Sequence, residues 1–160
     1  MTAVRVGTGF DAHRLVDGRP LVLGGVTIAH HRGLEGHSDG DCLVHAVCDA
    51  LLGAAGAGDL GSRYPSSDPR WKEASSMVFL AEAAREVGER GYVVENVDAT
   101  VIAEEPRLAP YTERMRMRLS DGLRVPPEAV SVKAKSTDGL GPYGRGEGIA
   151  ALCTLLLKRR

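Results

Sequence analysis

The sequence predicts an α+β fold, a mixed β-sheet with helices layered on one face. Three observations support this class. The chain has 160 residues, 43% of them hydrophobic and 26% charged, which is ordinary for one globular domain spanning residues 1–160. Strand-like patterns lie near both ends of the chain. Helical patterns lie mainly in its middle, where strands separate them, so we expect the helices to gather on one side of the sheet.

The first half of the chain starts with strand patterns. Apolar alternation predicts a strand over residues 3–10, and residues 21–28 read as a hairpin around a Gly-Gly pair. A helix is then expected from about Asp41 to Ala54, with either Ser38 or Asp39 as its N-cap. The turn-rich stretch that follows is too polar for core and is typical of a loop that carries binding groups.

The second half alternates between helices and strands. An amphipathic helix is predicted from Lys72 to Arg90 and a strand from Tyr92 to Ala103. Good helix formers favour a second helix from Tyr111 to Leu123. Strands at Ala129–Lys135 and Gly148–Lys158 complete the expected sheet.

One face of the helix expected over residues 41–54 is polar. Asp41, His45 and Asp49 are spaced by four residues and so share that face. The polar face is therefore expected to point at a specific partner. For Asp49 two interpretations stay open: it orients an imidazole, or it is a solvated carboxylate.

Two ligand-type side chains lie two residues apart after the first strand. Asp11 and His13 then point to the same side. With His45 they would form an Asp/His/His set with one open position, the ligand count of a catalytic zinc site, although iron or manganese would also suit it. The alternative is an ordinary strand end with a turn-forming Asp. Cys42 is either a fourth metal neighbour or a small buried hydrophobe.

A glycine-rich stretch over residues 133–148 is the second cluster with chemical potential. Gly139, Gly141 and Gly144 match a dinucleotide-binding pattern, but a strand follows them instead of the required helix, so we reject that interpretation. The Lys-Ser-Thr run at 135–137 supplies donors that suit phosphate oxygens. A plain glycine-rich turn between strands is the alternative.

Charge and hydropathy exclude several classes of function. The net charge of −1 gives no reason to expect nucleic acid or an anionic membrane as partner. The apolar runs are far shorter than the roughly 20 residues of a membrane span, and no secretory signal is visible, so we expect a cytoplasmic protein. Three cysteines without C-x-x-C spacing argue against a disulfide framework.

Several motifs, in order along almost the whole chain, resemble the 2-C-methyl-D-erythritol 2,4-cyclodiphosphate synthase family. They are Gly9-Phe10-Asp11-Ala12-His13, Gly36-His37-Ser38-Asp39-Gly40-Asp41 with His45, Asp49-Ala50-Leu51-Leu52-Gly53, Gly58-Asp59-Leu60-Gly61, Ser67-Asp68-Pro69 and Gly144-Arg145-Gly146-Glu147-Gly148. The resemblance implies an enzyme of the non-mevalonate isoprenoid pathway, a phosphorus-oxygen lyase. It would cyclise 4-diphosphocytidyl-2-C-methyl-D-erythritol 2-phosphate to the 2,4-cyclodiphosphate and release CMP.

The resemblance also implies the metal sites and the catalytic residues. Asp11, His13 and His45 match ligands of Zn²⁺, or of Mn²⁺ in its place, whose open position would face a β-phosphate oxygen of the substrate. A Mg²⁺ or Mn²⁺ ion would bridge the α- and β-phosphates beside Asp138, where the family often has a glutamate. His37 and Ser136 match positions that stabilise the transition state.

The implied substrate contacts fall in separate segments. Asp11, His13, His37 and Ser38 lie beside the metal. The erythritol part would contact Asp59, Leu60, Gly61, Tyr64, Pro65, Ser66, Ser67 and Asp68. The cytidine would contact Ala103, Pro106, Arg107, Leu108 and Ala109, with Lys135, Ser136, Thr137 and Asp138 around the phosphates. In the family these segments come from neighbouring subunits of a homotrimer.

The same resemblance places a hydrophobic cavity on the trimer axis. Pro142 and Arg145 fall near it, and Arg145 with Glu147 matches its gate, so an isoprenoid diphosphate is a possible axial ligand. Two other functions remain alternatives. One is a metal-dependent phosphohydrolase that uses the Asp/His/His set to activate water. The other is a trimeric isoprenoid-diphosphate-binding protein without catalysis.

Overall fold

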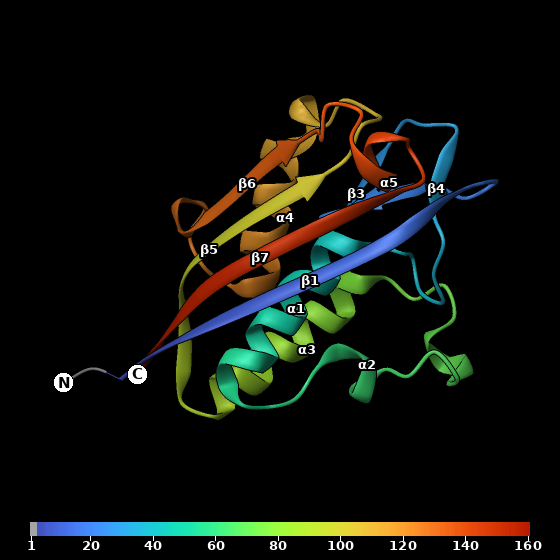
Figure 1. The fold of residues 1–160 in the computed structure, drawn as a ribbon. Helices are drawn as coiled ribbons and strands as arrows, with labels where there is room; N and C mark the ends of the chain where they lie inside the picture. Colours follow the sequence, from blue (N-terminus) through green and yellow to red (C-terminus); the bar gives the residue numbers. More distant parts are fainter. Residues whose placement is uncertain (1–2) are drawn as a thin grey trace.

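The computed structural model describes residues 3–160 and contains a five-stranded sheet in the order β4-β1-β7-β5-β6. The strands β5 and β6 are parallel, whereas the other neighbouring pairs are antiparallel. The predicted mixed sheet is therefore confirmed (Figure 1). Its strands are β1 (Val4–Asp17), β4 (Arg32–Leu34), β5 (Tyr92–Ile102), β6 (Val130–Lys135) and β7 (Gly148–Arg159), and a separate hairpin pairs β2 (Leu21–Leu23) with β3 (Val26–Ile28).

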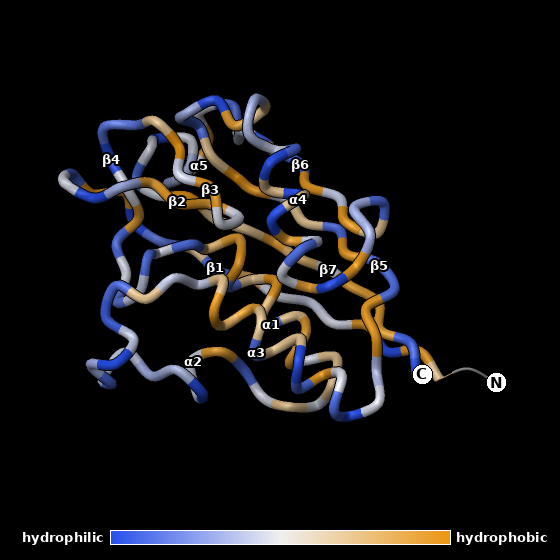
Figure 2. Tube along the Cα trace, turned by 180° about the vertical axis from the view of Figure 1, so that it is seen from behind, coloured by the Kyte–Doolittle hydropathy of each residue, from blue (hydrophilic) through white to orange (hydrophobic). Residues whose placement is uncertain are grey.

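Three longer helices, α1 (Cys42–Ala55), α3 (Ser76–Glu89) and α4 (Thr112–Leu123), pack on one face of this sheet, as predicted (Figure 1). Hydrophobic residues run along α1 and the central strands, while the surrounding loops are mostly hydrophilic (Figure 2). None of the helices in residues 3–160 is long and apolar enough to cross a membrane. Shorter helical segments are α2 (Leu60–Arg63), α5 (Gly141–Gly144) and the 3₁₀ turns η1 (Pro69–Trp71), η2 (Ala109–Tyr111) and η3 (Pro127–Ala129).

Strand β1 continues well past its predicted end at residue 10. It pairs with β7 as far as Arg14 and with β4 from Leu15 onward, so pairing rather than local pattern sets its length. Two glycines let α1 pack directly on it: a Cβ at Gly7 or Gly9 would lie 1.9 Å from a carbonyl oxygen of α1. Such an approach is open only to residues without a side chain. This close packing brings α1 next to the second half of β1.

The predicted caps of α1 are wrong, because Asp41 caps the helix itself. Its Oδ1 accepts the N–H of Val44 at 3.0 Å and of Gly24 at 2.9 Å, and its Oδ2 accepts that of Gly25 at 2.7 Å. Burial raises the pKa of Asp41 to about 6 even though these bonds lower it. The carboxylate thus ties the β2–β3 hairpin to α1. The expectation that Asp41 faces a ligand together with His45 is corrected accordingly.

Other helix and strand boundaries differ from the predicted ones where the sequence lacked a clear start signal. The helix expected from Lys72 begins only at Ser76, because Ser75 caps it and η1 precedes it. Strand β4 was not anticipated. The polar stretch after α1 and the glycine-rich stretch each contain a four-residue helix, α2 and α5, while β7 begins at Gly148 as expected.

The sheet face opposite the helices carries exposed apolar side chains. Val6 is 65% exposed, and Val4, Phe10 and Leu152 are also exposed. All four lie on the neighbouring strands β1 and β7. A cluster of this kind on a paired sheet is typical of a surface that another protein surface covers.

Candidate active site

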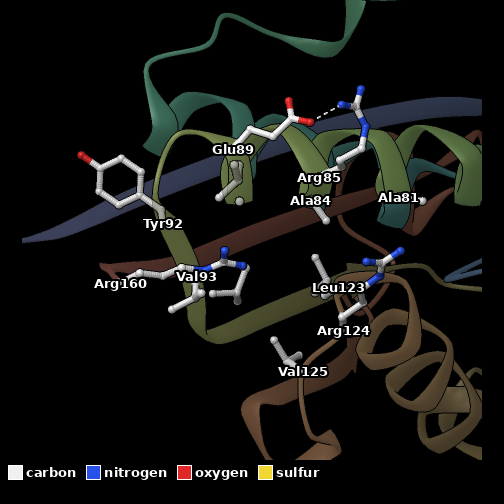
Figure 3. A pocket seen from close by; sticks show the side chains of 13 residues that line it. Ala81, Ala84, Arg85, Glu89, Tyr92, Val93, Leu123, Arg124, Val125 and Arg160 are labelled. Carbon is white, nitrogen blue, oxygen red and sulfur yellow. Dashed lines mark hydrogen bonds and ion pairs between the residues drawn. The ribbon is translucent and has the colours of Figure 1, made fainter.

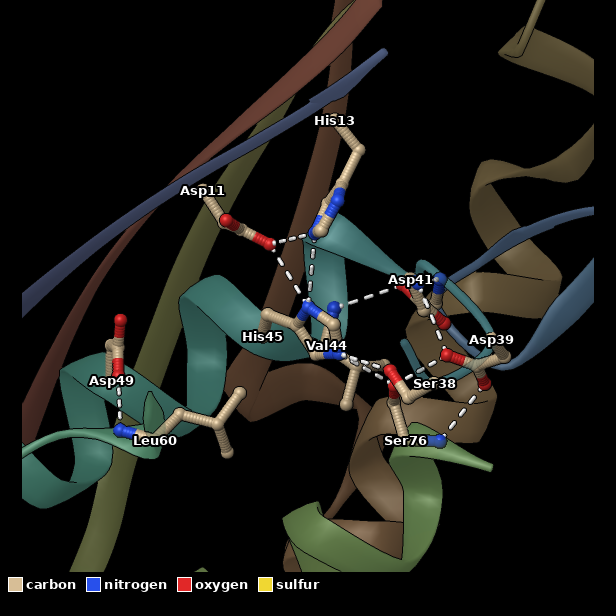
Figure 4. A network of polar contacts seen from close by, with 11 residues as sticks. Asp11, His13, Ser38, Asp39, Asp41, Val44, His45, Asp49, Leu60 and Ser76 are labelled. Carbon is tan, nitrogen blue, oxygen red and sulfur yellow. Dashed lines mark hydrogen bonds and ion pairs between the residues drawn. The ribbon is translucent and has the colours of Figure 1, made fainter. Parts of the chain in front are cut away.

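The predicted ligands Asp11, His13 and His45 converge (Figure 4). Asp11 Oδ2 lies 2.7 Å from His13 Nε2 and 2.9 Å from His45 Nδ1, and the two imidazole nitrogens are 3.3 Å apart. Strand alternation places the first two side chains on the face of β1 that α1 covers, and the first turn of α1 supplies the third. The convergence predicted from spacing is thereby confirmed.

The charges in this cluster suit a cation. Burial raises the pKa of Asp11, but hydrogen bonds from His13 and His45 outweigh it, so that the pKa falls to about 2. Burial lowers the pKa of His13, yet its bond to Asp11 and the charge of that carboxylate raise the net value above the usual one. The cluster thus presents an anionic oxygen and two imidazole nitrogens around one point. This donor set fits Zn²⁺ and also Mn²⁺ or Fe²⁺.

Cys42 is not part of the cluster, so the idea that it is a fourth metal neighbour is wrong. Within residues 3–160 the group of mutually close ligand atoms comprises Asp11, His13 and His45. The Cys42 side chain is completely buried in the core, and this burial raises the pKa of its thiol far above the ordinary value. The alternative interpretation, a small buried hydrophobe, describes it.

The far side of the His45 ring meets Ser76, which sequence reasoning missed, and Ser38, which was predicted as a substrate contact. Its Nε2 lies 2.7 Å from Ser76 Oγ and 3.3 Å from Ser38 Oγ (Figure 4). Asp39 holds Ser76 in turn, with Oδ1 2.5 Å from Ser76 Oγ. A capping pattern at residues 75–76 could reveal a helix start, but no spacing rule relates Ser76 to a residue so distant in the chain.

Asp49 takes neither of the roles considered for it. Its Oδ1 accepts the backbone N–H of Leu60 at 2.7 Å, so it neither bonds the imidazole nor stands free in solvent. This bond fixes the start of α2, where Asp59 caps the helix by accepting the N–H of Ser62 at 2.7 Å. Asp49 therefore positions the loop around Leu60 and Gly61 instead of the metal ligands.

A pocket of about 160 Å³ lies beside the three ligands. Most of its lining was predicted as ligand or substrate contact, and the lining residues are His13, His37, Ser38, His45, Leu60, Gly61, Tyr64, Ser66, Trp71 and Phe79. Trp71 and Phe79 were missed. The Tyr64 ring stacks on Phe79 at 4.3 Å and meets Trp71 edge-on at 5.1 Å. These rings give the pocket an apolar wall. The predicted contacts Asp59, Pro65, Ser67 and Asp68 belong to the same loop but lie outside the lining.

Backbone contacts hold His37 at the rim of this pocket. Its Nε2 lies 2.8 Å from the carbonyl oxygen of Asp68, which can only accept, so Nε2 carries the proton and donates. Arg19 donates to the carbonyls of Gly36 and Ser38 at 3.1 and 2.8 Å. The loop that carries His37 and Ser38 is therefore fixed on both sides.

The remaining predicted residues gather at the ends of β5 and β6. These strands are parallel, and Ile102 pairs with Lys135, so the segments that follow leave the sheet at the same edge. A pocket of about 210 Å³ lies between them, lined by Ala103, Glu104, Pro106, Arg107, Leu108, Ala109, Ala134, Lys135 and Ser136. The cytidine and phosphate segments inferred from the resemblance thus lie side by side.

The turn after β6 holds the last predicted residues in an open arrangement. Ser136 Oγ bonds Asp138 Oδ1 at 3.1 Å, and Thr137 Oγ1 donates to the carbonyl of Leu140 at 2.6 Å. Arg145 forms an ion pair with Glu147, and Pro142 is the second residue of α5. All three residues are exposed. Asp138 is not among the ligand atoms gathered at His45.

The two pockets have no lining residue in common within the described part of the chain. One chain therefore brings the predicted residues into two groups instead of one. A further pocket of about 370 Å³ lies between α3, β5 and the end of α4 (Figure 3). Its lining combines apolar residues with Tyr92, Arg124, Arg160 and the Arg85–Glu89 ion pair, and it contains none of the predicted site residues.

Comparison with known proteins identifies the family of this chain. Residues 4–158 match the YgbB family. The chain belongs to this family. It is 56% identical to the 2-C-methyl-D-erythritol 2,4-cyclodiphosphate synthase of Laribacter hongkongensis, over 98% of this chain and 97% of the relative.

Solved structures of similar proteins share the fold. One is a 2C-methyl-D-erythritol-2,4-cyclodiphosphate synthase in a CDP-bound form, 38% identical, with a TM-score of 0.87 over 96% of this chain and 99% of that one. Another is the bifunctional IspDF of Campylobacter jejuni, 41% identical, with a TM-score of 0.96. The match covers all of this chain and 43% of that longer protein. The α+β fold predicted from the sequence is thus confirmed.

Proposed function

We propose that this YgbB-family chain is a 2-C-methyl-D-erythritol 2,4-cyclodiphosphate synthase. It would cyclise 4-diphosphocytidyl-2-C-methyl-D-erythritol 2-phosphate in isoprenoid biosynthesis and release CMP, which makes it a phosphorus-oxygen lyase. The observation that carries the proposal is the convergence of Asp11, His13 and His45 beside a pocket, in a chain whose relatives bear this name. The cytoplasmic location stays a prediction.

The reaction needs positioning more than acid–base groups. An oxygen of the substrate's own 2-phosphate attacks the β-phosphorus, the bond from that phosphorus to CMP breaks, and the electron pair leaves with CMP. No protein nucleophile is required, but the two anionic ends of the substrate repel each other. Favourable orientation of an intramolecular reaction can contribute about 7–11 kcal/mol. The residues of the site are therefore expected to hold and neutralise phosphates.

The pocket at the ligand cluster supports binding of the reacting end. A divalent cation held by Asp11, His13 and His45 would supply Lewis-acid stabilisation of the diphosphate charge. His37 donates its Nε2 proton to the backbone carbonyl of Asp68. Its other ring nitrogen, Nδ1, therefore points away from that carbonyl. Ser38 adds a hydroxyl at the same rim. The loop from Asp59 to Asp68 would contact the erythritol part, and the aromatic wall of the pocket would lie against the carbon skeleton.

The pocket at the ends of β5 and β6 supports binding of the nucleotide end. Backbone groups over residues 103–109 would contact the cytosine, and Lys135 and Ser136 the phosphates. The CDP-bound form of a similar synthase supports a cytidine nucleotide as ligand. Thr137 and Asp138 would complete this half, and Asp138 would hold a Mg²⁺ or Mn²⁺ ion that neutralises diphosphate charge.

A homotrimer would join the two halves. The separation of the two pockets in one chain supports this, because a single substrate has to reach both. The exposed apolar face of β1 and β7 gives copies of the chain a surface to bury against one another. Pro142 and Arg145 would then lie near the axis, where an isoprenoid diphosphate is a possible ligand.

A phosphorus NMR time course of the purified protein with the cytidine diphosphate substrate, zinc and magnesium tests the proposal. We expect CMP to appear together with a coupled pair of ring diphosphate signals, and neither signal with the His13→Ala variant. CMP with a linear bisphosphate would instead show a phosphohydrolase. No reaction by metal-loaded protein would contradict the enzyme and favour a binding protein.

A further inference from the structure

We propose that Asp39 and Ser76 are positioning residues that fix the tautomer and orientation of His45. They would keep the Nδ1 lone pair of this imidazole available to a cation held between His45, Asp11 and His13. The inference rests on the proposed metal centre and concerns how the chain prepares it. The two residues lie on different elements, Asp39 before α1 and Ser76 at the start of α3.

The hydrogen bonds around Ser76 fix where each proton lies. Its backbone N–H donates to Asp39 Oδ2 at 2.9 Å, and its Oγ lies 2.5 Å from Asp39 Oδ1. An ionised carboxylate can only accept, so the Ser76 hydroxyl donates its one proton to Asp39. The Ser76 oxygen is then left with lone pairs toward His45 Nε2, 2.7 Å away. Nε2 must therefore carry a proton and donate.

The protonation of Nε2 decides the state of the opposite nitrogen. A neutral imidazole has a single N–H, so with a cation in the cluster Nδ1 of His45 would offer its lone pair to that cation, beside Asp11 Oδ2 and His13 Nε2. The other tautomer would need the Ser76 hydroxyl to donate to Nε2, which would break its bond to Asp39. It would also place a proton at the point where the three ligand atoms converge.

The chain of hydrogen bonds from Asp39 through Ser76 to His45, here called the relay, is rigid because its residues are buried and make further bonds. Ser76 is fully buried and His45 is 8% exposed. The backbone N–H of Asp39 donates to the carbonyl of Ala74 at 3.1 Å, and Asp39 Oδ1 also accepts the N–H of Asp41 at the same distance. Ser38 Oγ, 3.3 Å from Nε2, adds a weaker contact on the same side of the ring. The ring is thus held by α3 as well as by its own helix.

Two substitutions act on this relay in different ways. In Asp39→Asn the side-chain oxygen can accept the Ser76 N–H, and the new amide group then donates to Ser76 Oγ. The hydroxyl proton would turn toward His45 and drive the proton onto Nδ1. In Ser76→Ala the link is lost outright. Partners behind a metal-bound histidine typically change metal affinity by about 10–100-fold.

Asp49→Asn is the matched control. It removes a carboxylate from the same helix as His45, one turn away, where its Oδ1 bonds Leu60 instead of the ring. The measured quantity is the dissociation constant for Zn²⁺, obtained by competition with a chromophoric chelator on the full-length protein. Nitrogen-15 NMR of the zinc-loaded protein then reports which ring nitrogen of His45 carries a proton.

We expect Asp39→Asn and Ser76→Ala to weaken zinc binding about 10–100-fold, and the double variant to bind no more weakly than the worse single one. Asp49→Asn should stay within about twofold of wild type, and Nε2 of His45 in wild type should carry the proton. If Asp39→Asn and Ser76→Ala bind zinc as tightly as Asp49→Asn, or if Nε2 of His45 carries no proton in wild type, the roles of Asp39 and Ser76 are wrong. The metal centre itself would not be contradicted. Wild-type protein that binds no zinc would overturn the metal centre and the relay with it.

Discussion

The two halves of the proposed site differ in how completely one chain builds them. At the metal half, Asp11, His13 and His45 approach within hydrogen-bonding distance of one another and are largely buried. In the glycine-rich half, Ser136 and Asp138 are exposed and bond mainly to their own turn. The metal half is therefore preformed in one chain. The glycine-rich half presents hydrogen-bond donors that make few contacts outside their own turn.

The difference follows from the elements that carry each half. The metal half lies where a strand and a helix pack through glycines, so the fold itself fixes side-chain positions. The glycine-rich half lies in a connection after β6 whose residues are mostly exposed. Preorganisation should therefore be a property of the monomer at the first half and of the assembly at the second. Four predictions test this contrast, beginning with the largest effect.

Replacing His13 with alanine should have the largest effect on activity. The loss of one of three ligands removes the cation and its stabilisation of several kcal/mol, so the rate should fall about a thousandfold or more. The fold should persist because the His13 side chain is 21% exposed and not fully enclosed in the core. Steady-state CMP release and zinc content would be measured together. A variant that loses zinc yet keeps most of its activity would contradict the role of the metal half.

Ser136→Ala should reduce activity less and leave the metal half intact. The loss of one donor to a developing charge costs about 100-fold or more in kcat. The zinc dissociation constant should not change, since Ser136 lines only the pocket at the strand ends. Kinetics and chelator competition on the same preparation separate the two quantities. Weaker zinc binding in this variant would contradict the independence of the two halves.

The packing that builds the metal half should be visible in stability. Gly9→Ala places a Cβ 1.9 Å from the carbonyl oxygen of Ala46 and should cost about 1–3 kcal/mol of unfolding free energy. Gly53→Ala in the same helix meets open space and should stabilise by about 0.5–1 kcal/mol. Denaturant unfolding of metal-free protein compares them. Equal effects of the two changes would argue against close strand–helix packing.

The smallest expected effect is a pH dependence of the metal-free protein. The pKa of folded His13 is raised above its usual value, so its contribution to stability is present below about pH 6.5 and is lost as the pH rises through the folded pKa. Asp11→Asn removes the main attractive partner and should flatten this slope, by about 1 kcal/mol or less. Asp138→Asn should keep it. Unfolding curves between pH 6 and 9 provide the check, and an unchanged slope in Asp11→Asn would be inconsistent with the pair.

The metal half could be predicted from the sequence because periodicity is sufficient there. Spacing by two on a strand places Asp11 and His13 together, and the helix around His45 has a clear apolar stripe. Length and order of the elements also predicted the sheet and the side on which the helices lie. The lengthening of β1 to Asp17 could not be predicted, because its partners β4 and β7 are distant in sequence.

The residues behind the ligands were beyond sequence reasoning for the same physical reason. Asp41 looked like a ligand-facing carboxylate on a helical wheel, but the β2–β3 hairpin supplies it with backbone donors. Ser76 reaches the site through the packing of α3 on α1, and Trp71 reaches it beside Phe79 of α3. Local patterns show which groups a segment offers, whereas tertiary contacts decide which groups meet.

The central claim is that the two halves come from different copies of the chain. It is tested most directly by co-refolding inactive His13→Ala with inactive Ser136→Ala protein in equal amounts and measuring CMP release. If sites form between neighbouring subunits of a trimer, about one quarter of them combine two intact halves, and about a quarter of the wild-type activity should return. A mixture as inactive as either variant alone would contradict the shared site.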